Sequence, residues 1–174
     1  TQYGYGNRQF ENTDSLFLKK RRVIDKGNTE VVAEYIKEMT GADVFRIMPD
    51  KEYEKIQDYD ELVELTRIEH ENDERPTFNG KINDIGKYDT IFIGSPIWWY
   101  TFPQVMYTFL DSYDLNGKTI IPFTTHEGSG LADVVEVLRK YYPNATVAEG
   151  LAIRGRDAVK SKEKVVRWLE KTGF

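Results

Sequence analysis

The sequence predicts an α/β protein built on a three-layer, doubly wound parallel sheet. From Asn28 onward, segments with helical periodicity alternate with short apolar segments of strand type. The connections between strand segments are long enough for the right-handed crossovers that join parallel strands. The length of 174 residues, with 40% hydrophobic and 30% charged residues, suits one globular domain with a sizeable core. Ligands of such sheets bind beyond the carboxyl ends of the strands, so the loops there are expected to hold the site.

The first regular element is a helix over residues 29–39, where apolar side chains recur at helical spacing. Asn28 or Thr29 is expected to cap it, and Gly41 to end it. Alternating apolar residues over 42–48 then predict a strand.

The later elements continue the same alternation. Helices are expected over 59–70, 103–113, 130–141 and 158–171, and strands over 90–94, 119–124 and 145–153, the last interrupted at Gly150. The strands at 90–94 and 119–124 are almost wholly apolar, as expected when helices cover both faces of a parallel sheet. Proline in the first turn suits the helix at 103–113. The last helix is expected to turn inward Val159, Val165, Val166 and Leu169.

Composition excludes several classes of protein. The absence of cysteine rules out disulfides, thiolate catalysis and cysteine-ligated metal centres, which confines redox chemistry to a bound cofactor. A net charge of -5 argues against a nucleic-acid binder, and the two separated histidines argue against a histidine-built metal site. No apolar run approaches the roughly 20 residues of a membrane span. The polar start, residues 1–4, has no signal-peptide core, so a cytoplasmic location is expected.

Three loops meet the requirement for a site at the carboxyl ends of the strands. Residues 26–29, Lys-Gly-Asn-Thr, precede the first helix, where backbone N–H groups and a threonine hydroxyl can cradle a phosphate; an ordinary helix cap is the alternative. Residues 124–130, Thr-Thr-His-Glu-Gly-Ser-Gly, follow a buried strand, and their glycines permit close approach of a ligand. A flexible turn is the alternative there.

The most unusual loop is 94–103, Gly-Ser-Pro-Ile-Trp-Trp-Tyr-Thr-Phe-Pro. Three consecutive aromatic residues are difficult to explain as core, because adjacent side chains point in different directions. A planar aromatic ligand would explain them, since one ring can stack on it while the others wall the pocket. A hydrophobic plug under the next helix, or a partner-binding patch, remains the alternative.

These three motifs, in this order and spacing, resemble the flavodoxin-like FMN-binding family, in its bacterial branch with a Trp-rich second loop. The resemblance covers residues 27–174, which would form the flavodoxin-like domain, and leaves 1–26 as an atypical amino-terminal segment. It implies FMN as the cofactor, with the phosphate at the first helix and the isoalloxazine ring between the second and third loops.

The resemblance also assigns the candidate site residues. Asn28 and Thr29 would contact the phosphate, while the second and third loops would border the two sides of the ring. The full cofactor-binding set is Gly27, Asn28, Thr29, Ser95, Pro96, Ile97, Trp98, Trp99, Tyr100, Thr125, His126, Glu127, Gly128 and Ser129. No residue is required as a strong acid or base, but His126 or Tyr100 could donate a hydrogen bond or a proton to a bound acceptor.

The amino-terminal segment departs from the family pattern. Family members open with a buried apolar strand that leads into a Ser/Thr-rich phosphate loop, whereas residues 19–22 here are four consecutive basic residues, which read as a solvated loop. Either residues 15–18, Ser-Leu-Phe-Leu, form a degenerate first strand, or the first strand is missing. We favour the second, which leaves the central position of the sheet empty or filled by another segment, such as 16–18, 23–24 or a segment of a neighbouring subunit. An incomplete sheet edge would favour a homodimer.

Two function classes follow from the sequence. The first is an FMN-dependent oxidoreductase, acting either in electron transport with a redox partner protein or in NAD(P)H-dependent reduction of a small quinone-like acceptor. No G-x-G-x-x-G fingerprint is present, so NAD(P)H would bind transiently over the flavin. The second is a non-catalytic binding protein on a flavodoxin-like scaffold that has lost its cofactor, with the aromatic residues forming a protein-contact patch.

Overall fold

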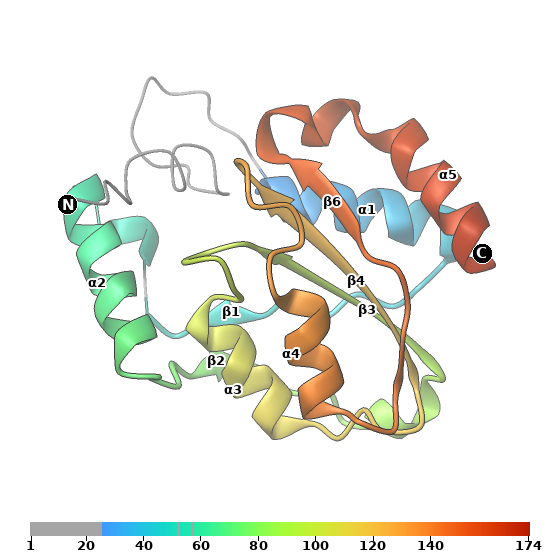
Figure 1. Ribbon diagram of the computed structural model, residues 1–174, viewed down its shortest axis with the longest axis horizontal. Coiled ribbons are helices and arrows are strands. Elements are labelled where there is room, and N and C mark those ends of the chain that lie inside the picture. Colours follow the sequence, from blue (N-terminus) through green and yellow to red (C-terminus); the bar gives the residue numbers. More distant parts are fainter. Residues whose placement is uncertain (1–25, 52, 57) are drawn as a thin grey trace.

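The computed structural model describes residues 26–51, 53–56 and 58–174, and Figure 1 shows the course of the chain. The segments considered for a first strand, residues 15–18 and 23–24, lie outside the described residues, as does the basic run. Within the part that the structure describes, no helix has the length and apolar character needed to cross a membrane.

A parallel sheet forms the centre of the molecule. Its middle strand is β4 (Thr119–His126), which pairs along one edge with β3 (Thr90–Pro96). Along its other edge β4 pairs first with β5 (Thr146–Val147) and then with β6 (Leu151–Arg154). The predicted break at Gly150 falls between β5 and β6. A Cβ atom there would lie 2.8 Å from the Leu131 side chain, so glycine is needed for this close approach.

Helices cover both faces of the sheet, which confirms the predicted three layers (Figure 1). α1 (Asn28–Thr40) and α5 (Lys162–Thr172) pack on one face. α3 (Gln104–Ser112) and α4 (Val134–Tyr141) pack on the other. Two separate apolar cores result, one on each side of the strands.

The two cores arise from the alternation of side chains along each strand. Ile120 of β4 packs in the core with α3 and α4, whereas its neighbour Ile121 packs in the core with α1 and α5. Both residues are fully buried. This is why β4 reads as a continuous apolar run in the sequence rather than as an alternating one.

The helix α2 (Tyr59–Glu71) lies to one side of the sheet in Figure 1. The Asp58 carboxylate caps it by accepting hydrogen bonds from the N–H groups of Asp60 and Glu61. The short strands β1 (Met48–Pro49) and β2 (Phe78–Asn79) run antiparallel on either side of α2 in the sequence.

Every region predicted as a helix, and every predicted strand region except 42–48, contains the expected element, with shifted ends. The cap of α1 is Gly27 rather than Asn28 or Thr29, and Gly41 ends this helix in the left-handed conformation at φ 70°, as predicted. Pro103 precedes α3 as its cap instead of occupying its first turn. α4 begins only at Val134, because turns at positive φ occupy the preceding residues.

The predicted strand over 42–48 is wrong for most of its length. Side chains alternate as in a strand, with Phe45 and Ile47 packed against the core and Val44 55% exposed. Among the described residues, however, only Met48 within this region has a strand partner. The segment is extended without the hydrogen-bonded neighbour that defines a strand. Likewise, in the described part of the chain β3 pairs along one edge only.

The last helix is also shorter than predicted. Residues Gly155–Lys160 form a 3₁₀ helix, and α5 starts only after Ser161, whose hydroxyl donates to the Ala158 carbonyl at 2.7 Å. This break changes the rotation of the chain, so the predicted inward position of Val159 is wrong and its side chain is 67% exposed. Beyond the break the prediction is confirmed for Val165 and Leu169, which are buried, whereas Val166 is only half-buried.

Candidate functional site

The carboxyl ends of β3 and β4 and the start of α1 converge at one edge of the sheet. Pro96 and Thr125 are register partners in the parallel pair, and the Ile97 N–H donates to the Thr125 carbonyl at 3.0 Å. The hydroxyls of Thr29 and Thr125 share a hydrogen bond of 2.6 Å, which ties the first turn of α1 to the end of β4. All three loops singled out in the sequence therefore lie next to one another.

The predicted residues divide between strand ends and loops. The start of α1 holds Gly27, Asn28 and Thr29. The strand β3 ends with Ser95 and Pro96 and is followed by Ile97, Trp98, Trp99 and Tyr100. The strand β4 ends with Thr125 and His126 and is followed by a loop of Glu127, Gly128 and Ser129. The side chains of Ser95 and Ile97 are buried, and the Ser95 hydroxyl donates to the Pro96 carbonyl at 2.7 Å. These two residues anchor the loop.

The start of α1 is suited to an anion. Gly27 caps the helix and has no side chain of its own to occupy the space in front of it. Backbone N–H groups and the positive end of the helix dipole concentrate at such a terminus. Because Thr29 is bonded to Thr125, this terminus is held at the same sheet edge as the other two loops.

Residues 98–101, which we call the aromatic turn, form a tight reversal of the chain. Trp98 and Thr101 exchange two backbone hydrogen bonds, each of 3.0 Å. Between them, Trp99 and Tyr100 have φ angles of 52° and 61°. Side chains other than glycine rarely adopt this left-handed conformation, and it costs about 1–2 kcal/mol for each residue. Tyr100 is 55% exposed, so this strained turn places the Tyr100 ring at the molecular surface, while Trp98 and Trp99 are partly buried.

Thr66 of α2 and Tyr53, which precedes this helix, contact the tryptophans of the aromatic turn. The Trp99 Nε1 donates to the Thr66 hydroxyl of α2 at 3.3 Å. The Tyr53 ring meets the Trp98 ring edge to face, with centroids 5.8 Å apart and an interplanar angle of 88°. Sequence reasoning missed both Tyr53 and Thr66. The available signal for Thr66 was a polar residue at helical spacing from the apolar Leu62 in a predicted helix.

The loop after β4 has ends that are fixed by a hydrogen bond and a tip with open space around it. The Thr124 hydroxyl donates to the Gly130 carbonyl at 2.9 Å and closes the loop. At its tip, a Cβ atom on Gly128 would find no other atom within 4 Å. The His126 side chain is only 9% exposed, and its Nδ1 atom has no hydrogen-bond partner among the described residues. Buried polar atoms are normally satisfied, so Nδ1 is free to bond to a ligand.

Burial lowers the pKa of His126 below its usual range, and the nearby cations of Arg154 and Lys164 lower the pKa further. Arg154 is the register partner of His126 on the neighbouring strand, which explains this effect. His126 is therefore neutral at neutral pH and carries a single N–H.

The lowered pKa of His126 predicts a loss of stability in acid. The unfolded chain takes up a proton near the ordinary pKa of 6.5, whereas the folded chain takes it up only at lower pH, so the free energy of unfolding falls as the pH drops below about 6.5. His126→Gln is expected to show a smaller fall between about pH 7.5 and pH 5.5, measured by urea unfolding. His70→Gln, at an exposed histidine, is the control for the substitution itself. Equal dependences for His126→Gln and wild type would contradict this assignment.

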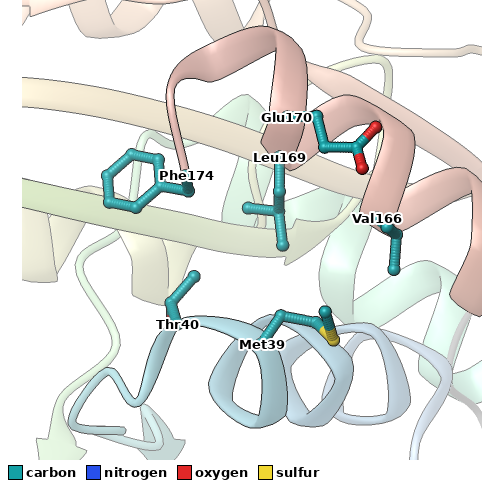
Figure 2. A pocket seen from close by; sticks show the side chains of 6 residues that line it. All are labelled: Met39, Thr40, Val166, Leu169, Glu170 and Phe174. Atoms are coloured by element: carbon teal, nitrogen blue, oxygen red, sulfur yellow. The ribbon is translucent and has the colours of Figure 1, made fainter.

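Two cavities among the described residues lie away from this convergence. One of about 140 Å³ lies between the ends of α1 and α5, lined by Met39, Thr40, Val166, Leu169, Glu170 and Phe174 (Figure 2). It is at the carboxyl end of α1, about 20 Å along the helix from Gly27. A second hollow, of about 660 Å³, lies along β5, β6 and α5. Neither is lined by a residue of the predicted set. Within the described part of the chain, no cluster of histidine and carboxylate side chains could hold a metal ion.

Comparison with known proteins agrees with this geometry. Solved structures of candidate flavoproteins from Bacteroides eggerthii and Bacteroides uniformis are 31% and 30% identical to this chain, each with a TM-score of 0.71. The alignments span 83% and 82% of this chain, respectively, and 90% of each Bacteroides chain. A flavoprotein from Lactobacillus acidophilus, solved in complex with FMN, shares the fold at 20% identity and a TM-score of 0.58, over 78% of this chain and 90% of its own.

No curated protein matches the chain. The flavodoxin family model, in contrast, matches residues 23–172, which is most of the sequence. The fold agrees with that match, because a parallel sheet lies between two helical layers and the three predicted loops meet at its carboxyl edge. The chain therefore belongs to the flavodoxin family.

Proposed function

We propose that this protein is an FMN-dependent redox protein, acting in electron transfer or in NAD(P)H-dependent reduction of a small quinone-like acceptor. The observation that carries the proposal is that three segments converge at one sheet edge. They are the start of α1, which suits an anion, the aromatic turn, and the end of β4 at His126 with the loop that follows it. The Thr29–Thr125 hydrogen bond and the backbone bond from Ile97 to Thr125 define this convergence.

The residues present suit both ends of FMN. The start of α1 offers backbone donors and a helix dipole for a phosphate. The aromatic turn offers rings for stacking on a planar heterocycle, and the open tip at Gly128 lets backbone approach it closely. The unpartnered His126 Nδ1 offers a polar contact to a ring heteroatom. The FMN found in the Lactobacillus acidophilus flavoprotein supports the same ligand class.

Bound FMN would supply the one- and two-electron chemistry. The chain's own contribution is to hold the ring and to limit access to it. Trp98 and Trp99 are partly buried and wall the site, whereas the exposed Tyr100 lies where an acceptor would enter. His126, neutral at neutral pH, holds one proton that it can place in a hydrogen bond to a ligand.

Titration with FMN tests the proposal. We expect the fluorescence of both the tryptophans and the flavin to fall in a saturable way, with flavin absorbance bands near 370 and 450 nm in the complex. Riboflavin, which lacks the phosphate, is expected to bind at least about tenfold more weakly, because it cannot use the start of α1. Absence of saturable quenching by FMN would reject the proposal and favour a cofactor-free interaction protein.

Once FMN binding is established, turnover separates the two redox roles. Oxidation of NAD(P)H in the presence of a soluble quinone, followed at 340 nm, would indicate the reductase role. FMN that can be reduced chemically but supports no such turnover would indicate an electron carrier.

A further inference from the structure

A buried carboxylate lies behind the aromatic turn. Among the side chains that the structure describes, Glu69 of α2 is the one carboxylate that is buried, at 2% exposure. Its Oε1 lies 2.6 Å from the Lys51 Nζ, and the Tyr53 hydroxyl donates to both carboxylate oxygens at 3.0 and 3.1 Å. An apolar residue of similar size would pack here at no cost in desolvation. The charge is therefore better explained by what it holds in place than by stability.

What Glu69 holds is the Tyr53 ring. Burial and the negative charge of Glu69 raise the pKa of Tyr53 far above its usual range, so its hydroxyl stays protonated and remains a donor. The phenol is buried and is fixed by the two bonds to Glu69. Its edge meets the Trp98 ring at a centroid distance of 5.8 Å. The carboxylate thus determines the position of Tyr53, and Tyr53 limits the orientations open to Trp98.

The face of α2 that carries Glu69 also contacts Trp99 of the aromatic turn. Leu62, Thr66 and Glu69 are buried together at helical spacing. Thr66 accepts the Trp99 hydrogen bond, and the Glu69 carbonyl accepts a hydrogen bond of 3.1 Å from the Gln104 side chain, at the start of α3. The Thr66 side chain therefore contacts the aromatic turn, and the Glu69 backbone contacts the start of α3, although α2 lies to one side of the sheet.

We propose that Tyr53, held by Glu69 and Lys51, is a positioning residue that sets the orientation of Trp98 at the flavin-facing surface. The role of Trp98 toward the flavin rests on the proposed function. The effect of Tyr53 on the orientation of Trp98 can be tested in protein without FMN. The proposal adds Lys51, Tyr53 and Glu69 to the site, none of which the sequence indicated as functional.

The test uses protein labelled with 5-fluorotryptophan, whose three ¹⁹F resonances are assigned by single Trp→Phe variants. In FMN-free protein, Tyr53→Leu is expected to shift the Trp98 resonance most, and Tyr53→Phe, which keeps the ring, to shift it least. Glu69→Gln leaves both rings in place but loosens Tyr53, so an intermediate shift is expected. The matched control is Tyr88→Phe, which removes a similar tyrosine–carboxylate bond, 2.6 Å to Asp43, at the opposite end of β3. It is expected to leave the Trp98 resonance unchanged.

FMN titration of the same proteins provides the second measurement. Loss of the edge-to-face pair in Tyr53→Leu is expected to raise the Kd for FMN about two- to tenfold, with Tyr53→Phe within about twofold of wild type. A Trp98 resonance that is unmoved in folded Tyr53→Leu and folded Glu69→Gln would overturn the inference. If wild-type protein binds no FMN, the proposed function fails, while the ¹⁹F shifts still decide whether Tyr53 positions Trp98.

Discussion

Replacing Gly94 with valine is expected to lower the free energy of unfolding by about 3 kcal/mol, at the upper end of the usual cost of overpacking. Gly94 lies within β3, and a Cβ atom there would come within 2.0–2.6 Å of three atoms of the Phe123 ring on β4. The ring cannot withdraw easily, because Phe123 is buried against α1 and α5. Urea unfolding followed by circular dichroism measures the effect.

A compensating variant checks the cause. Adding Phe123→Leu to Gly94→Val removes the clashing ring atoms and is expected to recover part of the lost free energy. Gly128→Ala is the control, because a side chain at Gly128 meets no other atom within 4 Å and its backbone is not left-handed. An unfolding midpoint for Gly94→Val equal to that of wild type would show that the contact between the two strands is not as close as described.

Replacing Trp99 and Tyr100 with Asn-Gly is expected to weaken FMN binding while leaving the free energy of unfolding nearly unchanged. Asn-Gly is favoured in two-residue turns with two positive φ angles, so the variant relieves the strain at 52° and 61°. It also loses the bond from Trp99 to Thr66, so the free energy of unfolding is expected to stay within about 1 kcal/mol of wild type. The Kd for FMN is expected to rise about tenfold to hundredfold, because stacking on an aromatic ring contributes about 1–3 kcal/mol.

The two measurements are urea unfolding and FMN titration by fluorescence. Phe174→Ala is a suitable control for aromatic content, since Phe174 lies by the cavity at the far end of α1 (Figure 2). It is expected to leave FMN affinity unchanged. Wild-type FMN affinity in the Asn-Gly variant would exclude the aromatic turn as the flavin wall. The strain at Trp99 and Tyr100 would then need another explanation, such as contact with a protein partner.

Local patterns predicted most of the fold. The apolar runs that became β3 and β4 were recognisable because helices cover both faces of the sheet. The positions of Gly41 and Gly150 were also recognisable, since a left-handed helix end and a close approach of backbone both require glycine. The candidate loops followed from their place after these strands, and the structure brings them to one sheet edge.

The two main errors have different physical causes. Residues 42–48 alternate like a strand, but pairing depends on a neighbouring strand that their own sequence does not contain. Val159 fits the periodicity of the last helix, but the break at Ser161 rotates it outward. The first effect depends on residues outside a window of ten to fifteen, whereas the second is a local turn that helical periodicity alone does not reveal.

The sequence by itself determined the layers of this protein, the family to which it is similar and the loops that form the candidate site, because periodicity, glycine positions and short motifs are local properties. Only the tertiary structure decided that Trp99 and Tyr100 are strained, that Thr29 is bonded to Thr125, and that Tyr53 and Glu69 lie behind Trp98. Those facts depend on contacts between residues 16 to 96 positions apart and on backbone angles imposed by the turn. Such contacts arise when the elements pack, and no single segment of the chain encodes them.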